Sequence, residues 1–242
     1  MFQKILSKVN GALSGSAAKQ YVAEIARYHR IQASPGFRQA AAYVHAALTK
    51  RGIAVETLSF AGDGKTFYWA SLVPPEWDAS AAELRLVGPD RRKLADYREC
   101  KISLIQRSDA TPPAGVEAEL VALEDGTEET HYGGLDVAGK VVLTSSSDLR
   151  RVRALAVDGH GAIGILYDGM ADAPPVRTRI DLPDARQYVS FWQSGDEKSP
   201  CFGFSLSPRL GDDLRRRLKN ARTGEPVRVW ARVDSRFVPM GT

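Results

Sequence analysis

The acidic residues of this chain include two groups that could take part in metal chemistry. Glu128 and Glu129 are adjacent, as a general base and a metal ligand can be, but the surrounding stretch EDGTEETHY is typical of a solvated connection. Asp158, His160 and Asp168 form the second group. It offers fewer ligands than zinc needs, and a single histidine at a helix-to-strand turn is typical of a cap or surface residue. Neither group predicts a metal site.

Two positions could supply a nucleophile. Ser145–Ser147 follows a predicted strand and precedes a predicted helix, which is a suitable place for a catalytic serine. The run lacks the G-x-S-x-G pattern of a nucleophile elbow, and Ser147 or Asp148 as the helix N-cap explains it more simply. Cys201 lies in a predicted strand, where cysteine is usually a small buried hydrophobic residue. A hydrolase that uses these side chains is therefore a minor alternative.

Two glycine-rich stretches resemble phosphate-binding loops without meeting their requirements. Gly62–Thr66 matches the end of the pattern G-x-x-x-x-G-K-[ST], but Ser59 stands where the first glycine is needed and no helical pattern follows. Gly159, Gly161 and Gly164 follow a helix and precede a strand, which reverses the order of a dinucleotide-binding loop. We predict turns at both places.

The tryptophans could line a groove for a peptide. Trp69 and Trp230 lie in apolar predicted strands, so we expect them to pack in a core or at a sheet edge, whereas Trp77 and Trp192 have no such context. Taken together, the acidic, nucleophilic, glycine-rich and tryptophan patterns assign no residue to catalysis, cofactor binding or metal binding.

The composition is typical of a folded protein that does not bind nucleic acid. The 242 residues, 43% of them hydrophobic, can bury a substantial core in one large or two small domains. The net charge is +4, and the basic clusters Arg91–Lys93, Arg150–Arg153 and Arg215–Arg217 occur among nearly as many acids. They lack the interleaved aromatic residues that single-stranded nucleic acid requires. We therefore expect no nucleic-acid partner.

The sequence also limits location and covalent cross-linking. No stretch reaches the ~20 apolar residues of a membrane span. Lys4 and Lys8 interrupt the N-terminal apolar stretch, which makes a poor secretory signal, so we expect a cytoplasmic protein. Cys100 and Cys201 are too few for a disulfide framework, and we expect two unpaired strand cysteines rather than a bridge.

The first 60 residues predict two helices and a strand. Apolar residues recur at helical spacing from Val22 to His29. Ser34 can cap a second helix with Pro35 at its first position, and Gly52 fits its C-terminal cap. The β-branched run Ile53–Phe60 then predicts a strand.

Short strands dominate the remainder. We predict strands at Phe67–Val73, Glu83–Val87, Ile102–Gln106, Ala118–Leu123, Val141–Thr144, Ile163–Tyr167, Phe202–Leu206 and Val227–Val233, and helices at Asp148–Val157 and Pro208–Lys219. Asp168–Ser199 is rich in Pro, Asp and Arg, which predicts a long surface loop with a brief strand at Tyr188–Trp192. The strand–helix–strand run up to Tyr167 predicts a short crossover between neighbouring strands.

Three stretches together resemble a known family. They are EIARYHRIQASPGFRQAAAYVHAALTKRGIAVE, DVAGKVVL with the later GAIGILYD, and VRVWARVDSRFVPMGT. These resemble, in order, the leading helix pair, the protease-associated core and the return strand of metallopeptidase family twenty-eight, the di-zinc aminopeptidases. The resemblance implies an α+β chain in which a helix–helix–strand unit (residues 1–81) precedes a β-rich protease-associated-like domain (82–234). Residues 235–242 would lead back toward a catalytic domain.

The chain departs from this family in its metal ligands. The family binds two zinc ions through a His-x-Asp, a bridging Asp, a Glu–Glu pair, a further acid and a distant His, and this sequence has no His-x-Asp. The resemblance therefore implies zinc only in a catalytic domain outside this chain. We expect a non-catalytic region that shapes substrate access or assembly, with that domain, a protein, a peptide or a second copy as partner. The alternative is a stand-alone protein- or peptide-binding module without peptidase activity.

Overall fold

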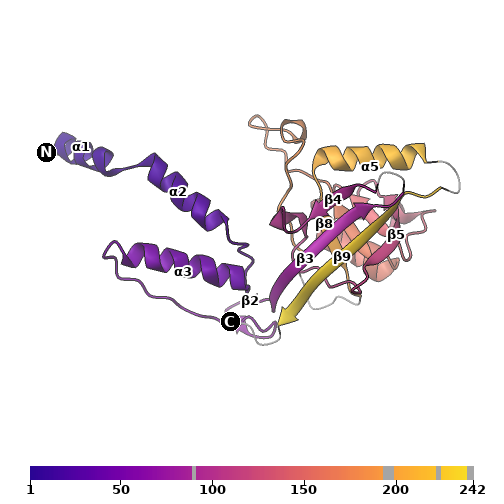
Figure 1. The fold of residues 1–242 in the computed structure, drawn as a ribbon, viewed down its shortest axis with the longest axis horizontal. Coiled ribbons are helices and arrows are strands. Elements are labelled where there is room, and N and C mark those ends of the chain that lie inside the picture. The colour runs from indigo at the N-terminus through magenta and orange to yellow at the C-terminus, as the bar shows by residue number, and fades with distance from the viewer. Residues whose placement is uncertain (89–90, 193–198, 222–224, 239–242) are drawn as a thin grey trace. The chain divides into compact units, whose positions relative to one another are not determined.

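The computed structural model describes residues 1–88, 91–192, 199–221 and 225–238. The chain forms two compact units (Figure 1), here called unit 1 (Met1–Glu76 with Val238) and unit 2 (Trp77–Phe237). The division between them lies at the start of strand β3 (Glu76–Leu86), which continues through residues 81 and 82. The boundaries of a protease-associated-like domain stay a prediction.

Unit 1 contains the helices α1 (Phe2–Ala12), α2 (Gly15–Ala26) and α3 (Pro35–Thr49). The start of α3 confirms the predicted cap: the Ser34 hydroxyl accepts a hydrogen bond from the backbone N–H of Phe37 at 3.2 Å. Local chemistry alone therefore explains where this helix begins.

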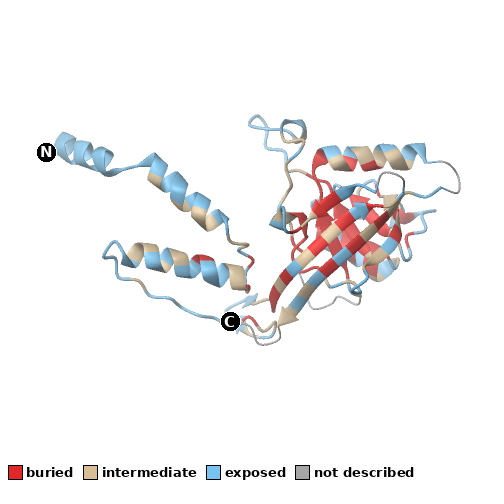
Figure 2. Ribbon diagram, in the orientation of Figure 1, coloured by how far each residue is buried: buried red, intermediate tan, exposed pale blue. Residues whose placement is uncertain are grey.

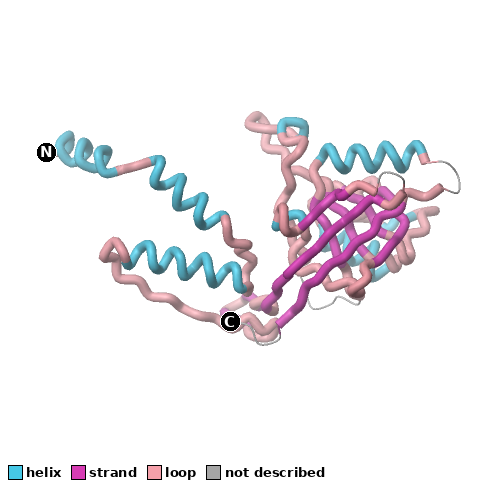
Figure 3. Tube along the Cα trace, in the orientation of Figure 1, coloured by secondary structure: helices cyan, strands magenta, loops and turns pink. Residues whose placement is uncertain are grey.

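Two predictions for the first 60 residues are wrong. The first predicted helix was expected to reach His29, but α2 ends at Ala26. Ile53–Phe60 forms no strand, although its backbone follows α3 as an extended segment that is mostly exposed (Figure 3). A β-branched run becomes a strand only when a neighbouring strand pairs with it. The short hairpin of β1 (Phe67–Tyr68) and β2 (Ser71–Leu72) pairs these two strands with each other and not with Ile53–Phe60.

Unit 2 is built on a mixed seven-stranded sheet in the order β4-β3-β9-β5-β6-β7-β8. The strands besides β3 are β4 (Lys93–Asp96), β5 (Val116–Ala122), β6 (Val141–Thr144), β7 (Gly164–Tyr167), β8 (Phe202–Ser205) and β9 (Arg228–Val238). From β5 to β8 all neighbours are parallel, while β5–β9 and β3–β4 are antiparallel. Every residue of β6, β7 and β8 is buried, as expected for parallel strands covered on both faces (Figure 2).

The helices of unit 2 follow the parallel strands. Helix α4 (Leu149–Val152) comes directly after β6 and continues as a π-helical segment (Arg153–Gly159) before β7. Residues of this helical stretch, among them Val152, Ala156 and Val157, join the main apolar cluster of the unit. Helix α5 (Pro208–Asn220) begins at Ser207, whose hydroxyl caps it, and packs against β5.

Most of the elements predicted after residue 60 are present, with three differences. Val141–Thr144 is a strand with the predicted bounds, and the parallel pairing of β6 with β7 across a short helix is confirmed. Strand β4 was missed, because its four residues carry two charges and no alternating apolar pattern. Ile102–Gln106 is a 3-10 turn (Lys101–Ser103) followed by single bridges, and Phe67–Val73 folds as a hairpin.

The described helices include none that is both long enough and apolar enough to cross a lipid bilayer. Cys100 and Cys201 both carry free thiols. Cys100 precedes the 3-10 turn and Cys201 precedes β8, so neither lies within a strand as predicted.

Candidate functional site

A cavity of unit 2 lies where two parallel strands end. Strand β6 ends at Thr144 and β7 ends at Tyr167, and because the strands are parallel their carboxyl ends lie at the same edge of the sheet. In open sheets of this kind ligands bind beyond the carboxyl ends of the strands. The cavity, here called the strand-end cavity, has a volume of about 840 Å³.

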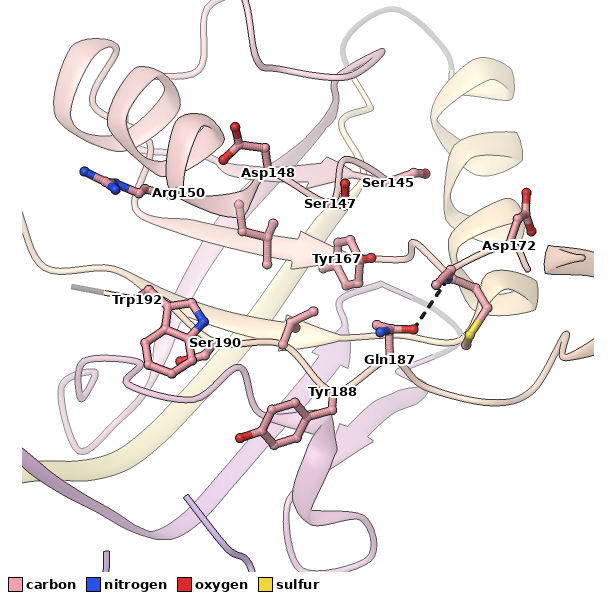
Figure 4. A pocket seen from close by; sticks show the side chains of 14 residues that line it. Ser145, Ser147, Asp148, Arg150, Tyr167, Asp172, Gln187, Tyr188, Ser190 and Trp192 are labelled. Carbon is pink, nitrogen blue, oxygen red and sulfur yellow. Dashed lines mark hydrogen bonds between the residues drawn. The ribbon is translucent and has the colours of Figure 1, made fainter. Parts of the chain in front are cut away.

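Three segments surround the strand-end cavity. Figure 4 shows Ser147 and Asp148 on one side, Gln187, Ser190 and Trp192 on the other, and Tyr167 between them. The full lining is Ser145, Ser147, Asp148, Leu149, Arg150, Tyr167, Met170, Ala171, Asp172, Gln187, Tyr188, Val189, Ser190 and Trp192. The lining combines polar groups with the aromatic rings of Tyr167, Tyr188 and Trp192, a mixture that is typical of small-molecule and peptide sites.

A buried carboxylate holds the strand ends together. Asp168 is 0% exposed, and its oxygens accept hydrogen bonds from the Ser145 hydroxyl at 2.8 Å and from the Arg215 guanidinium at 3.0 and 3.3 Å. Arg215 also donates to Ser145 Oγ and to the backbone oxygen of Leu123. Arg179 lies 3.6 Å from the same carboxylate. Charge and hydrogen bonds therefore connect β5, β6, β7 and α5 at this edge.

This network leaves Ser145 poorly suited to be a nucleophile. Its hydroxyl donates to Asp168 and accepts from Arg215, and among the described residues these contacts do not include the imidazole that activates a typical catalytic serine. The predicted N-cap of the following helix is Asp148, whose carboxylate accepts from the N–H of Arg151 at 3.0 Å. The serine run therefore has a structural explanation.

The far wall of the strand-end cavity is stiffened by a buried cation. Arg107 is 2% exposed, donates to the Ser190 hydroxyl at 2.9 Å and lies 4.8 Å from the centre of the Trp192 ring. Burial lowers the pKa of Arg107, which Tyr188 counteracts. The ring of Trp192 itself is 54% exposed and lines the cavity. An exposed aromatic ring is thus held in place from behind.

The floor of the strand-end cavity carries a hydroxyl group. Tyr167 is the last residue of β7, and burial together with the neighbouring Asp168 raises its pKa. The phenol therefore stays protonated at neutral pH and can donate a hydrogen bond. Sequence reasoning missed Tyr167 because an aromatic residue at the end of an apolar strand is usually part of the core.

The two acidic groups singled out in the sequence do not come together to form a metal site. His160 pairs with Glu129 at 2.7 Å, whereas the Asp158 carboxylate accepts from the N–H of Ser199 and Asp168 pairs with arginines. Within the residues that the structure describes, no three His, Cys, Asp or Glu side chains lie close enough together to hold a metal ion.

The glycine-rich turn of unit 1 is closed by its own acid. The Asp63 carboxylate accepts from the N–H groups of Lys65 and Thr66, both at 2.8 Å, and from the Thr66 hydroxyl. These hydrogen bonds lower the pKa of Asp63 to about 2, and the bond from the Thr66 N–H has the largest effect. A carboxylate therefore occupies the N–H groups that would have to cradle a phosphate, and the predicted turn is confirmed.

The tryptophans differ from their predicted roles in one case. Trp69 is fully exposed at the turn of the β1–β2 hairpin, with a φ of 56°. The prediction that it packs in a core or at a sheet edge is therefore wrong. The two-residue turn turns its side chain away from the hairpin. Trp230 is half-buried over Gly115 and donates to the backbone oxygen of Ala114, while Trp77 is fully buried.

We expect Cys201 to be chemically silent in the folded chain. Burial raises the pKa of its thiol to about 12, so at pH 8 almost none is thiolate. An aromatic disulfide reagent at pH 8 should modify only the partly exposed Cys100, and both cysteines after unfolding in guanidinium. Peptide mapping identifies the modified residue, and rapid labelling of native Cys201 would contradict this expectation.

Comparison with solved structures finds a similar fold in two aminopeptidases. The zinc aminopeptidase of Bacillus subtilis matches with a TM-score of 0.53 at 14% identity, over 93% of this chain and 45% of its own. The aminopeptidase of Aneurinibacillus sp. strain AM-1 matches with a TM-score of 0.50 at 17% identity, over 90% and 44%. No protein-family model and no curated protein matches the sequence. The chain therefore shares its α+β fold with zinc aminopeptidases and spans less than half of their length.

Proposed function

We propose that this chain is a non-catalytic region of a zinc-dependent aminopeptidase-like hydrolase, and that unit 2 shapes the access of peptide substrates. The likeness to the Bacillus subtilis zinc aminopeptidase over 93% of the chain is the observation that supports this most directly. In this proposal unit 2 corresponds to the protease-associated-like domain, and the zinc ligands belong to a catalytic domain outside the chain.

The strand-end cavity supports a binding role for unit 2. Ser145 of its lining is committed to the Asp168 network, and the rest of the lining includes exposed rings, a phenol and an amide. A β-rich module with such a cavity can contact or exclude a peptide without acting on it.

Unit 1 supports the assembly half of this proposal. Its helices expose apolar side chains, among them Ile5, Val9, Val22 and Phe37. Exposed apolar side chains at helical spacing are typical of a face that another element covers. We assign that role to the catalytic domain, and a second copy of the chain is the alternative partner.

The exposed rings of Tyr188 and Trp192 favour a second candidate function. Aromatic anchors at a cavity are typical of protein-binding surfaces, so the chain could act as a stand-alone peptide-binding module without peptidase activity.

Two measurements separate these functions. Intact mass of the polypeptide from its source cell should exceed 26.4 kDa if the chain is part of a peptidase, and should equal it for a stand-alone module. The 242-residue chain should release no product from leucine p-nitroanilide, with or without added zinc. Zinc-dependent turnover by this chain alone would overturn the proposal.

If unit 2 contacts the substrate, Trp192→Ala should weaken the binding of long peptide substrates and leave the binding of small ones unchanged. In the native polypeptide we expect the KM for a hexapeptide to rise about fivefold, roughly 1 kcal/mol, with no change for leucine p-nitroanilide. Leu135→Ala is the matched control, because Leu135 is an exposed apolar residue of unit 2 outside the cavity. Equal effects of both substitutions, or an equal change for the small substrate, would argue against the assignment.

A further inference from the structure

The segment Tyr188–Trp192 is paired along one edge only. Gln106 donates its N–H to the backbone oxygen of Val189 at 3.2 Å, and Phe191 donates to the backbone oxygen of Gln106 at 3.0 Å. These two bonds form an isolated parallel bridge between Gln106 and Ser190. The brief strand predicted at this place is thus present as an extended segment held by a single bridge.

This segment extends the main sheet beyond β8. Leu104 forms an antiparallel bridge with Phe204 of β8, and two residues later Gln106 bridges Ser190. The order of pairing is therefore β8, then Leu104–Gln106, then Tyr188–Trp192. The last of these is the outermost of the three, and we call it the edge segment.

The outer side of the edge segment carries hydrogen-bonding groups. In an extended chain, the N–H and C=O of one residue point to the same side, and those of its neighbours to the other. Val189 and Phe191 face Gln106, so the groups of Tyr188 and Ser190 face outward. Within the residues that the structure describes, these outward N–H and C=O groups have no hydrogen-bond partner.

The strand-end cavity borders this edge. Four consecutive residues, Gln187–Ser190, line it. Because successive side chains of an extended segment point to opposite faces, a cavity that touches four in a row must lie along the edge of the segment. Figure 4 shows Gln187 and Ser190 on one side of the cavity and Ser147 and Asp148 on the other, while the Tyr188 ring points away from Ser147 and Asp148.

The edge segment is also held rigidly. The Tyr188 hydroxyl donates to Gln106 Oε1 at 2.8 Å, and Arg107 binds both Ser190 and Trp192 from behind. Tyr188 is 49% exposed, and Tyr188 and Trp192 flank Ser190 along the chain, two residues away on each side. A partner strand would meet a preformed edge, so little conformational entropy is lost on binding.

We infer that the edge segment binds an extended peptide as an added β-strand. Backbone groups of the peptide would pair with the N–H and C=O of Ser190, and its alternate apolar side chains would contact Leu149, Val189 and the Trp192 ring. The segment spans about five residues, roughly 17 Å. This inference rests on the proposed peptide-contacting role and names the mode of recognition.

The test uses the full 242-residue chain and defined peptides. The probe is an equimolar set of acetylated hexapeptide amides in which Val, Leu and Phe alternate with Ser and Thr. A second set has the same side chains with N-methyl groups on alternate residues, which removes backbone donors. Equilibrium dialysis with mass spectrometry measures retention, and we expect the unmethylated peptides to be retained and the N-methylated ones to be lost.

Two substitutions at one position isolate the backbone contribution. Ser190→Pro removes the outward N–H, and we expect about tenfold weaker retention, since a strand edge binds through its main chain. Ser190→Ala removes the hydroxyl and its bond to Arg107 but keeps the outward N–H, so it should lose much less peptide retention than Ser190→Pro. Circular dichroism verifies that both variants fold.

A further readout does not depend on the variants. Hydrogen exchange across residues 187–192 should slow when the unmethylated peptides are present. Retention of neither peptide set, equal retention of both, or equal losses in the two Ser190 variants would overturn the inference. These assays involve no turnover, so their failure is distinct from that of the proposed function, which fails on zinc-dependent activity of this chain.

Discussion

Replacing Asp168 by alanine is expected to lower the free energy of unfolding of unit 2 by about 3 kcal/mol, because removing one partner of a buried ion pair leaves the other uncompensated. The carboxylate is fully buried and satisfies Arg215, Arg179 and the Ser145 hydroxyl together. Its loss leaves the guanidinium of Arg215 partly desolvated at the ends of β6 and β7. Chemical denaturation followed by tryptophan fluorescence measures the change.

A matched substitution at the surface calibrates this result. Asp184 also forms an ion pair with an arginine, Arg209 at 2.7 Å, but both side chains are largely exposed. Asp184→Ala should therefore leave the unfolding midpoint nearly unchanged, because solvent screens such pairs. If the two aspartates had equal effects, the Asp168 network would have no special role in holding the strand ends.

Gly211→Ala is expected to destabilise unit 2, although helix propensity predicts the opposite. Gly211 lies inside α5, where alanine is favoured over glycine by roughly 0.5–1 kcal/mol. A Cβ at this position would overlap the carboxylate of Asp168, which packs directly against the helix. Overpacking of this kind costs about 1–3 kcal/mol. We therefore expect a net loss of about 1–2 kcal/mol in denaturation experiments.

Two further variants test the cause of this loss. Gly11 lies in α1 with no atom within 4 Å of its missing Cβ, so Gly11→Ala should not destabilise the chain. In the double variant Asp168→Ala with Gly211→Ala, the overlapping carboxylate is absent, and the combined loss should be smaller than the sum of the single losses. Strict additivity would contradict direct contact between the two residues.

Much of the fold could be predicted from the sequence, since many of its determinants are local. Val141–Thr144 is an uninterrupted apolar run followed by polar residues, and it is a strand with those bounds. Ser34 caps its helix through an N–H three residues away. By contrast, Ile53–Phe60 has the composition of a strand but no partner strand in the described part of unit 1, so composition alone misled.

The candidate site could not be predicted in the same way. Ser145 was noted for its chemistry and Asp168 as a weak metal ligand, yet the structure joins them to each other across 23 residues and joins Asp168 to Arg215 across 47. Tyr167 and Gln187 carried no distinguishing signal. Such contacts depend on the order of strands in the sheet, which no short-range pattern encodes.

The sequence by itself determined the helix caps and the buried parallel strands, because hydrogen bonds and periodicity over a few residues set these features. Only the tertiary structure decided that Asp168 lies beneath Gly211 and that one side of Ser190 borders a cavity. The physical reason is that burial and pairing are properties of neighbours in space. Those neighbours are brought together by the sheet, from segments that lie far apart along the chain.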